Sequence, residues 1–193
     1  FEIIFELPRR PEKFTKEEWL KDYLFARYGV HDEKITQAWS ILADGIYNCP
    51  FGNNQQGPHE SIFCGRPGLN NFQASSWSKM QNYYDPTSTE AAARLMLEVA
   101  HKYKRNNHFE YDLVDIVRQS LSDRGRIVYN QTIADFKSFD KKSFAAHSQE
   151  FLNILLAQNR LLGTRSEFRV GRWIEQARNL GTTPEEKDLY EWN

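Results

Sequence analysis

The sequence predicts an all-α protein, an irregular bundle of about six to seven helices with one long ordered loop. Three observations predict this class. Thr-x-x-Glu, which is typical of a helix N-terminus, recurs before stretches with apolar residues three and four positions apart. Glycines follow several of these stretches, as expected at helix C-termini. No segment alternates like a strand except the first five residues, FEIIF, which fit either a strand or a helix. The expected capping boxes are Thr15/Glu18, Thr87/Glu90, Thr164/Glu167 and Thr183/Glu186.

The first two helices are expected at residues 16–28 and 32–47. Gly29 follows the first and is suited to a left-handed C-cap. In the second, Ile35, Ala38, Leu42 and Ile46 repeat at helical spacing. Because the connection is short, we expect an αα-hairpin.

Helical spacing returns after residue 87. We expect a helix at 88–103 and a long one over 109–136, which Gly125 softens. Two more are expected at 141–162, closed by Gly163, and at 165–180, closed by Gly181. A final helix at 184–193 begins with proline, which is favoured at the first helical position.

Residues 48–86 form the long loop. This segment is dense in Gly, Pro, Asn, Gln and Ser, yet it also carries Phe, Ile, Leu, Trp and Tyr side chains that could pin it to a surface. Long ordered loops inside a compact domain are often functional. We therefore look for binding residues here.

Composition excludes several classes of partner. The net charge of -1 and pI of about 6.6 give no broad basic field for nucleic acid or anionic lipid. No apolar run approaches the roughly 18 to 20 residues needed to span a bilayer. Cys49 and Cys64 are too few for a disulfide scaffold or a thiolate zinc site, although one bridge between them is sterically conceivable. With no initiator Met, and a helical pattern still running at LYEWN, both ends are expected to be cut.

The sequence shows no complete active site and implies no cofactor or metal. Nucleophile-elbow, phosphate-loop, His-Glu-x-x-His and Cys-x-x-Cys motifs are all missing. The five histidines are scattered singly. On the 109–119 helix, Asp112, Asp115 and Arg118 favour a buried ion-pair network that anchors two helices over catalysis, and Arg172, Glu175 and Arg178 are interpreted alike.

Several segments, in order, resemble one known family. They are FELPRR, FARYGV (25–30), AWSIL (38–42), YNC (47–49), GRPGL (65–69), SSW (75–77), FEYDLVDIVRQ (109–119), FRVGRWIEQAR (168–178) and LYEWN (189–193). Together they resemble the C-terminal helical domain of the α-N-acetylglucosaminidases, glycoside hydrolase family 89. These retaining glycosidases remove terminal α-linked N-acetylglucosamine.

The resemblance implies an architecture. Residues 1–14 would be the exit from a preceding (β/α)8 barrel, and residues 15–193 the first part of a C-terminal all-helical domain, truncated at its C-terminus. Both catalytic glutamates would lie in the barrel, roughly 5 Å apart as a retaining mechanism requires. The resemblance therefore assigns no catalytic residue to this chain, and implies two partners, the chain's own barrel and a glycan ending in α-linked N-acetylglucosamine.

Three loop residues are the expected sugar contacts. Trp77 matches a family tryptophan that would stack on a pyranose, with core packing as the alternative. Arg66 and His59 also match family positions, and for Arg66 bracing of the loop is the favoured alternative. Animal members have a second cysteine close after the one matching Cys49, whereas this sequence has FGNNQQ, so no 49–64 bridge carries over.

Two other hypotheses remain. The chain could be an independent helical module that binds glycans or protein through its aromatic loop, or it could hydrolyse substrate alone, which is not expected. Binding of a glycan array by the isolated chain would favour the module. A bacterial periplasmic or secreted location is favoured over a lysosomal one.

Overall fold

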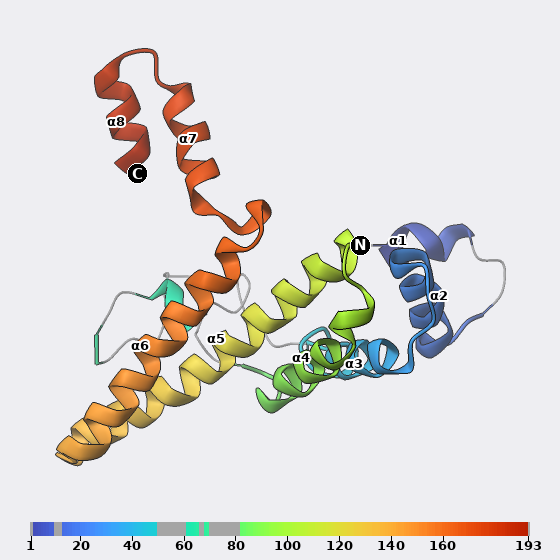
Figure 1. The fold of residues 1–193 in the computed structure, drawn as a ribbon, viewed down its shortest axis with the longest axis horizontal. Coiled ribbons are helices and arrows are strands. Elements are labelled where there is room, and N and C mark those ends of the chain that lie inside the picture. The colour runs from blue at the N-terminus through green and yellow to red at the C-terminus, as the bar shows by residue number, and fades with distance from the viewer. Residues whose placement is uncertain (1, 10–12, 50–60, 66–67, 70–81, 193) are drawn as a thin grey trace. The chain divides into compact units, whose positions relative to one another are not determined.

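The computed structural model describes residues 2–9, 13–49, 61–65, 68–69 and 82–192. In these ranges it contains eight α-helices, four short 3-10 helices and no strand, which confirms the all-α prediction (Figure 1). Residues 2–5 of the FEIIF segment belong to the helix α1. The α-helices are α1 (Glu2–Glu6), α2 (Lys16–Tyr28), α3 (Glu33–Asp44), α4 (Thr87–Val99), α5 (Asn107–Lys137), α6 (Lys141–Gly163), α7 (Val170–Leu180) and α8 (Pro184–Trp192). The 3-10 helices are η1 (Leu7–Arg9), η2 (Ile62–Cys64), η3 (Ala100–Lys102) and η4 (Ser166–Phe168).

The chain forms two compact units. The first comprises Phe1–Gln55 and Gln81–Ser120, and the second Gln56–Met80 and Leu121–Asn193. Helix α5 contributes its first half to one unit and its second half to the other.

The first unit has a closed apolar core. Helices α2, α3 and α4 and the start of α5 each turn one apolar face inward, as the spacing of these residues predicts. Aromatic rings extend this core, since Tyr28 and Tyr103 both pack on the buried Phe109. The buried apolar residues are Leu20, Leu24, Tyr28, Ile35, Ala38, Leu42, Ala92, Ala93, Met96, Val99, Phe109 and Ile116.

A buried carboxylate joins three of these helices. Asp112 on α5 accepts a hydrogen bond from Arg27 Nη2 at 2.6 Å and another from the Tyr28 hydroxyl at 2.7 Å, both on α2. Trp39 Nε1, on α3, donates to that hydroxyl at 2.9 Å. Burial and the Asp112 charge raise the pKa of Tyr28. The expected network between helices is thus confirmed for Asp112.

The other expected ion pairs differ from the prediction. Asp115 and Arg118 pair within α5 alone, with about a third of each side chain exposed. In the second unit, Arg178 bonds to Asp188 and Glu191 of α8.

Two of the four predicted capping boxes are confirmed. Thr15 with Glu18 begins α2, and Thr183 with Glu186 begins α8. The prediction at Thr87 is wrong, because Thr87 is already the first residue of α4 and Asp85 Oδ1 accepts from its amide at 2.9 Å. The prediction at Thr164/Glu167 is also wrong. Thr164 follows the last residue of α6 and its hydroxyl donates backward to Leu161 O.

Some helix boundaries also differ from the predicted ones. Helix α3 ends at Asp44 instead of residue 47. Helix α7 begins at Val170 instead of 165, because η4 intervenes and Arg169 donates to the carbonyl oxygen of Gly163. Gly29 has the expected left-handed conformation with φ 75°. Gly181 does not, with φ -74°, and a Cβ there would lie 2.7 Å from Lys187 N.

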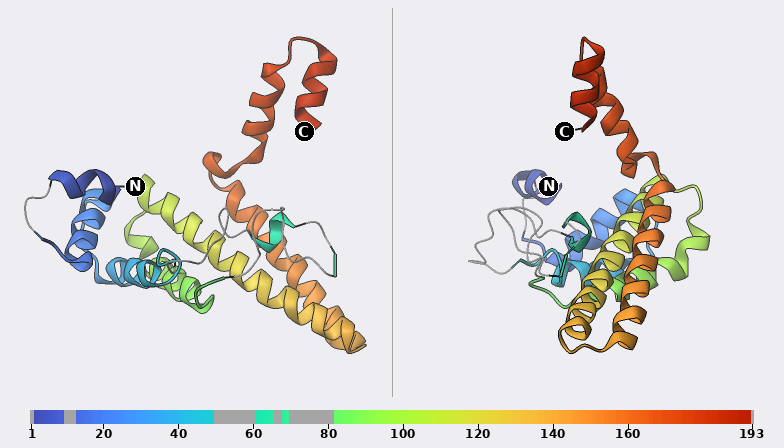
Figure 2. Two further views of the ribbon diagram at one scale, coloured as in Figure 1. Left: turned by 180° about the vertical axis from the view of Figure 1, so that it is seen from behind. Right: turned by 90° about the vertical axis from the view of Figure 1, so that its left-hand side faces the viewer.

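The second unit is built on the pairing of α6 with the end of α5. The two helices lie side by side and are joined by a short turn (Figure 2). Asp140 caps α6 by accepting from the amides of Lys142 and Ser143. His147 Nδ1 lies 2.6 Å from Asp135 Oδ2 across the pair. The C-terminal helices α7 and α8 form a second helical hairpin.

Replacing Asp112 with alanine should destabilise the first unit strongly. The change leaves the Arg27 guanidinium without its carboxylate partner and removes the acceptor of the Tyr28 hydroxyl. Removing one partner of a buried ion pair costs on the order of 3 kcal/mol. Chemical denaturation monitored by circular dichroism measures the loss. Asp115→Ala, which breaks the more exposed pair, should cost at most about 1 kcal/mol. Equal losses in the two variants would contradict this account of the core.

Candidate functional site

The three predicted sugar contacts, His59, Arg66 and Trp77, lie outside the described residues. The structure does describe residues 61–65 and 68–69, as well as both ends of the predicted loop, at Asn48 and at 82–86. It therefore shows where this segment is attached in each unit.

In the second unit, the segment is attached to α5 through η2. Ser61 caps η2 by accepting from Phe63 N at 3.2 Å, and its hydroxyl lies 2.6 Å from that of the buried Ser122. The ring of Phe63 covers Gly125, where a Cβ would lie 2.5 Å from Cζ. Helix α5 runs through Gly125 without a break. This glycine therefore makes room for the Phe63 ring, and the expectation that it softens the helix stays a prediction.

An apolar groove adjoins this attachment. The Phe63 and Phe151 rings lie 5.6 Å apart, and Tyr129 donates its hydroxyl to Gly68 O at 3.1 Å. The groove has a volume of about 570 Å³. With so few polar groups in its walls it suits apolar side chains better than a sugar, whose hydroxyls need partners. Its lining includes Ile62, Phe63, Leu69, Tyr129, Ile133, Phe144, Phe151, Leu152 and Leu155.

In the first unit, two adjacent tyrosines fix the other end of the segment. Tyr83 donates its hydroxyl to Ile46 O, and Tyr84 receives a hydrogen bond from Gln119 Nε2 at 3.0 Å. The two rings meet edge to face, with centroids 5.4 Å apart. The side chains of both tyrosines are thus held by hydrogen bonds.

A more polar hollow of about 590 Å³ lies beside these tyrosines. Its two carboxylates already have structural partners, since Asp44 pairs with Lys16 and Asp85 binds the Thr87 amide. A hollow with this lining can offer hydroxyl, amide and ring contacts to a polar ligand, but its carboxylates have no arrangement suited to acid and base catalysis. It is lined by Gln37, Ser40, Ile41, Asp44, Gly45, Asn48, Tyr83, Tyr84, Asp85 and Ser88.

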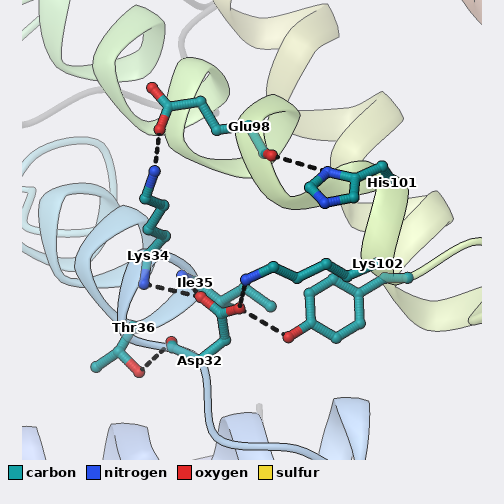
Figure 3. A network of polar contacts seen from close by, with 8 residues as sticks. Asp32, Lys34, Ile35, Thr36, Glu98, His101 and Lys102 are labelled. Atoms are coloured by element: carbon teal, nitrogen blue, oxygen red, sulfur yellow. Dashed lines mark hydrogen bonds and ion pairs between the residues drawn. The ribbon is translucent and has the colours of Figure 1, made fainter.

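The carboxylate of Asp32, at the start of α3, has several hydrogen-bond partners (Figure 3). It accepts from Lys34 N at 2.9 Å and from the Tyr103 hydroxyl at 2.8 Å, and Lys102 Nζ lies 3.3 Å away. Burial raises the pKa of Asp32, but these hydrogen bonds outweigh it and lower the pKa overall. Burial and Asp32 together raise the pKa of Tyr103 to about 12. These contacts thus keep Asp32 ionised. Its carboxylate caps α3 and links this helix to Lys102 and Tyr103, which follow α4.

No metal site is evident in the part of the chain that the structure describes. Its His, Cys, Asp and Glu side chains form no cluster that could hold a metal ion. His31 stacks on Phe25, and His101 Nδ1 lies 3.1 Å from Glu98 O. Cys49 and Cys64 are exposed and not joined by a disulfide. No helix within the described ranges is long and apolar enough to cross a membrane.

Comparison with known proteins identifies the family. Residues 19–193 match the family model described as the alpha-N-acetylglucosaminidase (NAGLU) C-terminal domain. The chain belongs to this family. The chain is also 30% identical to the human alpha-N-acetylglucosaminidase over 176 residues. These residues cover 91% of this chain and 23% of the human protein.

Solved structures agree with this membership. A family 89 glycoside hydrolase from Clostridium perfringens in complex with 2-acetamido-1,2-dideoxynojirmycin is 30% identical, with a TM-score of 0.88, over 98% of this chain and 22% of its own. The C. perfringens enzyme in complex with its substrate GlcNAc-alpha-1,4-galactose has the same identity and TM-score, over 98% of this chain and 21% of its own. This α-N-acetylglucosaminidase C-terminal domain thus spans about a fifth to a quarter of the length of these relatives.

Sequence reasoning missed two features of the attachment. The Asp85 cap has a visible signal, since an aspartate two positions before Thr87 is itself a favoured capping residue. The packing of the Phe63 ring on Gly125 has no such signal in the sequence, because the two residues lie 62 positions apart. Only the folded chain brings them together.

We expect Gly125→Ala to destabilise the protein, against the usual preference of helices for alanine. The new methyl group would overlap the Phe63 ring, and overpacking of this kind costs about 1–3 kcal/mol. Gly171→Ala, in α7, has open space and should be neutral or stabilising by up to about 1 kcal/mol. Thermal unfolding of both variants measures the contrast.

A double variant isolates the cause. If the Phe63 ring is what Gly125 accommodates, Gly125→Ala should cost much less in a Phe63→Ala background. An undiminished cost there would show that the methyl group meets something else.

Asp32→Ala should weaken the fold in a pH-dependent way. Because the pKa of Asp32 is lowered in the folded state, its contribution is fully present above the ordinary value of 3.8 and is lost as pH falls through the lowered value. At pH 6 we expect a loss of about 1 kcal/mol, typical of a removed cap. Urea unfolding of both proteins at pH 6 and near pH 3 should show the difference shrinking. Asp44→Ala, at an exposed pair, should change little at either pH.

Proposed function

We propose that this chain is the helical domain of an exo-acting, retaining α-N-acetylglucosaminidase that removes terminal α-linked N-acetylglucosamine. The observation that carries the proposal is the family match over residues 19–193, together with the likeness to an enzyme solved with GlcNAc-alpha-1,4-galactose. The domain would pack against a catalytic (β/α)8 barrel elsewhere in the protein and help to line the sugar pocket.

The catalytic groups are proposed to come from outside residues 1–193. A retaining glycosidase needs two carboxylates roughly 5 Å apart, one as nucleophile and one as acid and base. The prominent carboxylates of the described chain are engaged otherwise, Asp112 in the core, and Asp32 and Asp85 as caps. About four fifths of the length of the relatives lies beyond the region they share with this chain.

Trp77 is the proposed sugar-stacking residue, with His59 and Arg66 as further contacts. An indole face can cover the apolar face of a pyranose and exclude water from it. What supports this role is the family match and the firm attachment of the same segment at η2 and at Tyr83 and Tyr84. Attachment on both sides would limit the conformational freedom lost on binding a sugar.

In the full-length protein, Trp77→Ala should lower kcat/KM for an aryl α-N-acetylglucosaminide by up to about tenfold, because loss of a stacking surface of this kind costs about 0.5–1.5 kcal/mol. Trp77→Phe keeps a ring and should retain part of the activity. Circular dichroism melts would show that both variants stay folded.

Other outcomes would count against the proposal. Unchanged kinetics in Trp77→Ala would remove this residue from the sugar pocket. A full-length protein that binds glycans without hydrolysing the aryl glycoside would instead favour a binding module.

A further inference from the structure

The second half of α5 carries three residues that contact the segment between α3 and α4. Ser122, Gly125 and Tyr129 stand three and four positions apart, so they lie on one face of the helix. At a rise of 1.5 Å per residue, this contact strip is about 10 Å long. The strip and the described residues that it contacts all belong to the second compact unit.

Two members of the contact strip hold residues 61–65, which include η2. The hydroxyl of the buried Ser122 lies 2.6 Å from the hydroxyl of Ser61. Because Gly125 has no side chain, the ring of Phe63 can lie directly against the helix. A hydrogen bond is directional and a ring seated on a glycine depends on a close steric fit. Together the two contacts specify both the position and the orientation of η2 on α5.

The third member holds the chain on the other side of residues 66–67. Tyr129 donates its hydroxyl to the carbonyl oxygen of Gly68 at 3.1 Å. Since the acceptor is a backbone atom, this contact fixes the main chain directly. The tyrosine ring is itself packed, because it lies 6.2 Å from the ring of Phe151 on α6, measured between centroids. The described chain is therefore attached to α5 both before and after residues 66–67.

We propose that Ser122, Gly125 and Tyr129 are positioning residues for sugar recognition. The proposal rests on the proposed function, in which the segment between α3 and α4 helps to line the sugar pocket. Contacts on both sides of a short stretch reduce the number of conformations that it can adopt before substrate arrives. Less conformational entropy is then lost when the sugar binds. The three residues act through the segment that they hold, without contacting the sugar.

A purely structural role of the contact strip would affect the kinetics differently. A variant that merely unfolds more readily lowers the concentration of active enzyme, and therefore the apparent kcat, while KM of the molecules that remain folded is unchanged. A variant that loosens only the binding segment weakens substrate binding by the folded enzyme, which raises KM with little change in kcat. The two roles are therefore separated by measuring KM and kcat independently.

The test uses Tyr129→Phe in the full-length protein, because this change removes the hydroxyl and keeps the ring that packs on Phe151. With an aryl α-N-acetylglucosaminide as substrate, KM should rise about threefold to tenfold, as expected for the loss of one hydrogen bond. The value of kcat should change by less than about twofold. Ser138→Ala is the matched control, since Ser138 donates its hydroxyl to Asp135 O just after the end of α5, and it should leave KM unchanged.

Hydrogen exchange measures the attachment itself. In Tyr129→Phe, the peptide that contains residues 61–69 should exchange its amide hydrogens faster than in the wild-type protein, because a contact that limits local opening is lost. The same peptide should exchange at the wild-type rate in Ser138→Ala. Adding Ser122→Ala to Tyr129→Phe should raise both the exchange rate and KM further, since a second contact is removed.

Several outcomes would overturn the proposal. An unchanged KM with faster exchange in Tyr129→Phe would show that the contact strip holds the segment without aiding substrate binding. A lower kcat with an unchanged KM would assign the strip a purely structural role, and an equal rise of KM in Ser138→Ala would show that the effect is not specific. Each of these results leaves the proposed function standing if the wild-type protein hydrolyses the aryl glycoside. A wild-type protein without this activity would sink the proposed function, and the positioning role with it.

Discussion

The first unit depends on the carboxylate of Asp112. It receives hydrogen bonds from Arg27 and Tyr28, and Tyr28 in turn receives one from Trp39. A charge that is removed from water must be met by partners in good geometry, so α2, α3 and α5 can pack together only in a narrow range of arrangements. The apolar residues around this network stabilise the core through burial, but the hydrophobic effect is not directional and does not select one arrangement of the helices. The carboxylate therefore contributes specificity to a core whose stability comes mainly from its apolar residues.

Helix α5 also bears contacts that attach the predicted binding segment. Beyond Asp112 it bears Gln119, which holds Tyr84, and then Ser122, which meets Ser61. One turn further on, Gly125 receives the ring of Phe63. A single helix thus bears the contacts that attach two described parts of the segment between α3 and α4. For a sugar contact such as that proposed for Trp77, firm attachment nearby matters because each loosened residue would add to the entropy lost on binding.

The two units differ in how completely they bury their apolar surface. Helices α2, α3 and α4 each bury several side chains in a shared core. Helices α7 and α8 bury none and leave two tryptophans exposed. Within the described residues, the first unit thus buries more of its apolar side chains than the C-terminal hairpin of the second unit does.

The sequence by itself determined the class of the fold and most of its helices. Helical spacing and local caps, such as Thr15 with Glu18 and Gly29, act over three or four residues and can be recognised along the chain. The family was also recognisable from the order of its segments. Tertiary structure decided which groups meet across long separations: Asp112 with Arg27, Phe63 with Gly125, and Arg178 with α8. The physical reason is range, because a cap or an apolar stripe is specified by neighbours in sequence, whereas a buried ion pair or a ring seated on a glycine exists only after distant segments have packed.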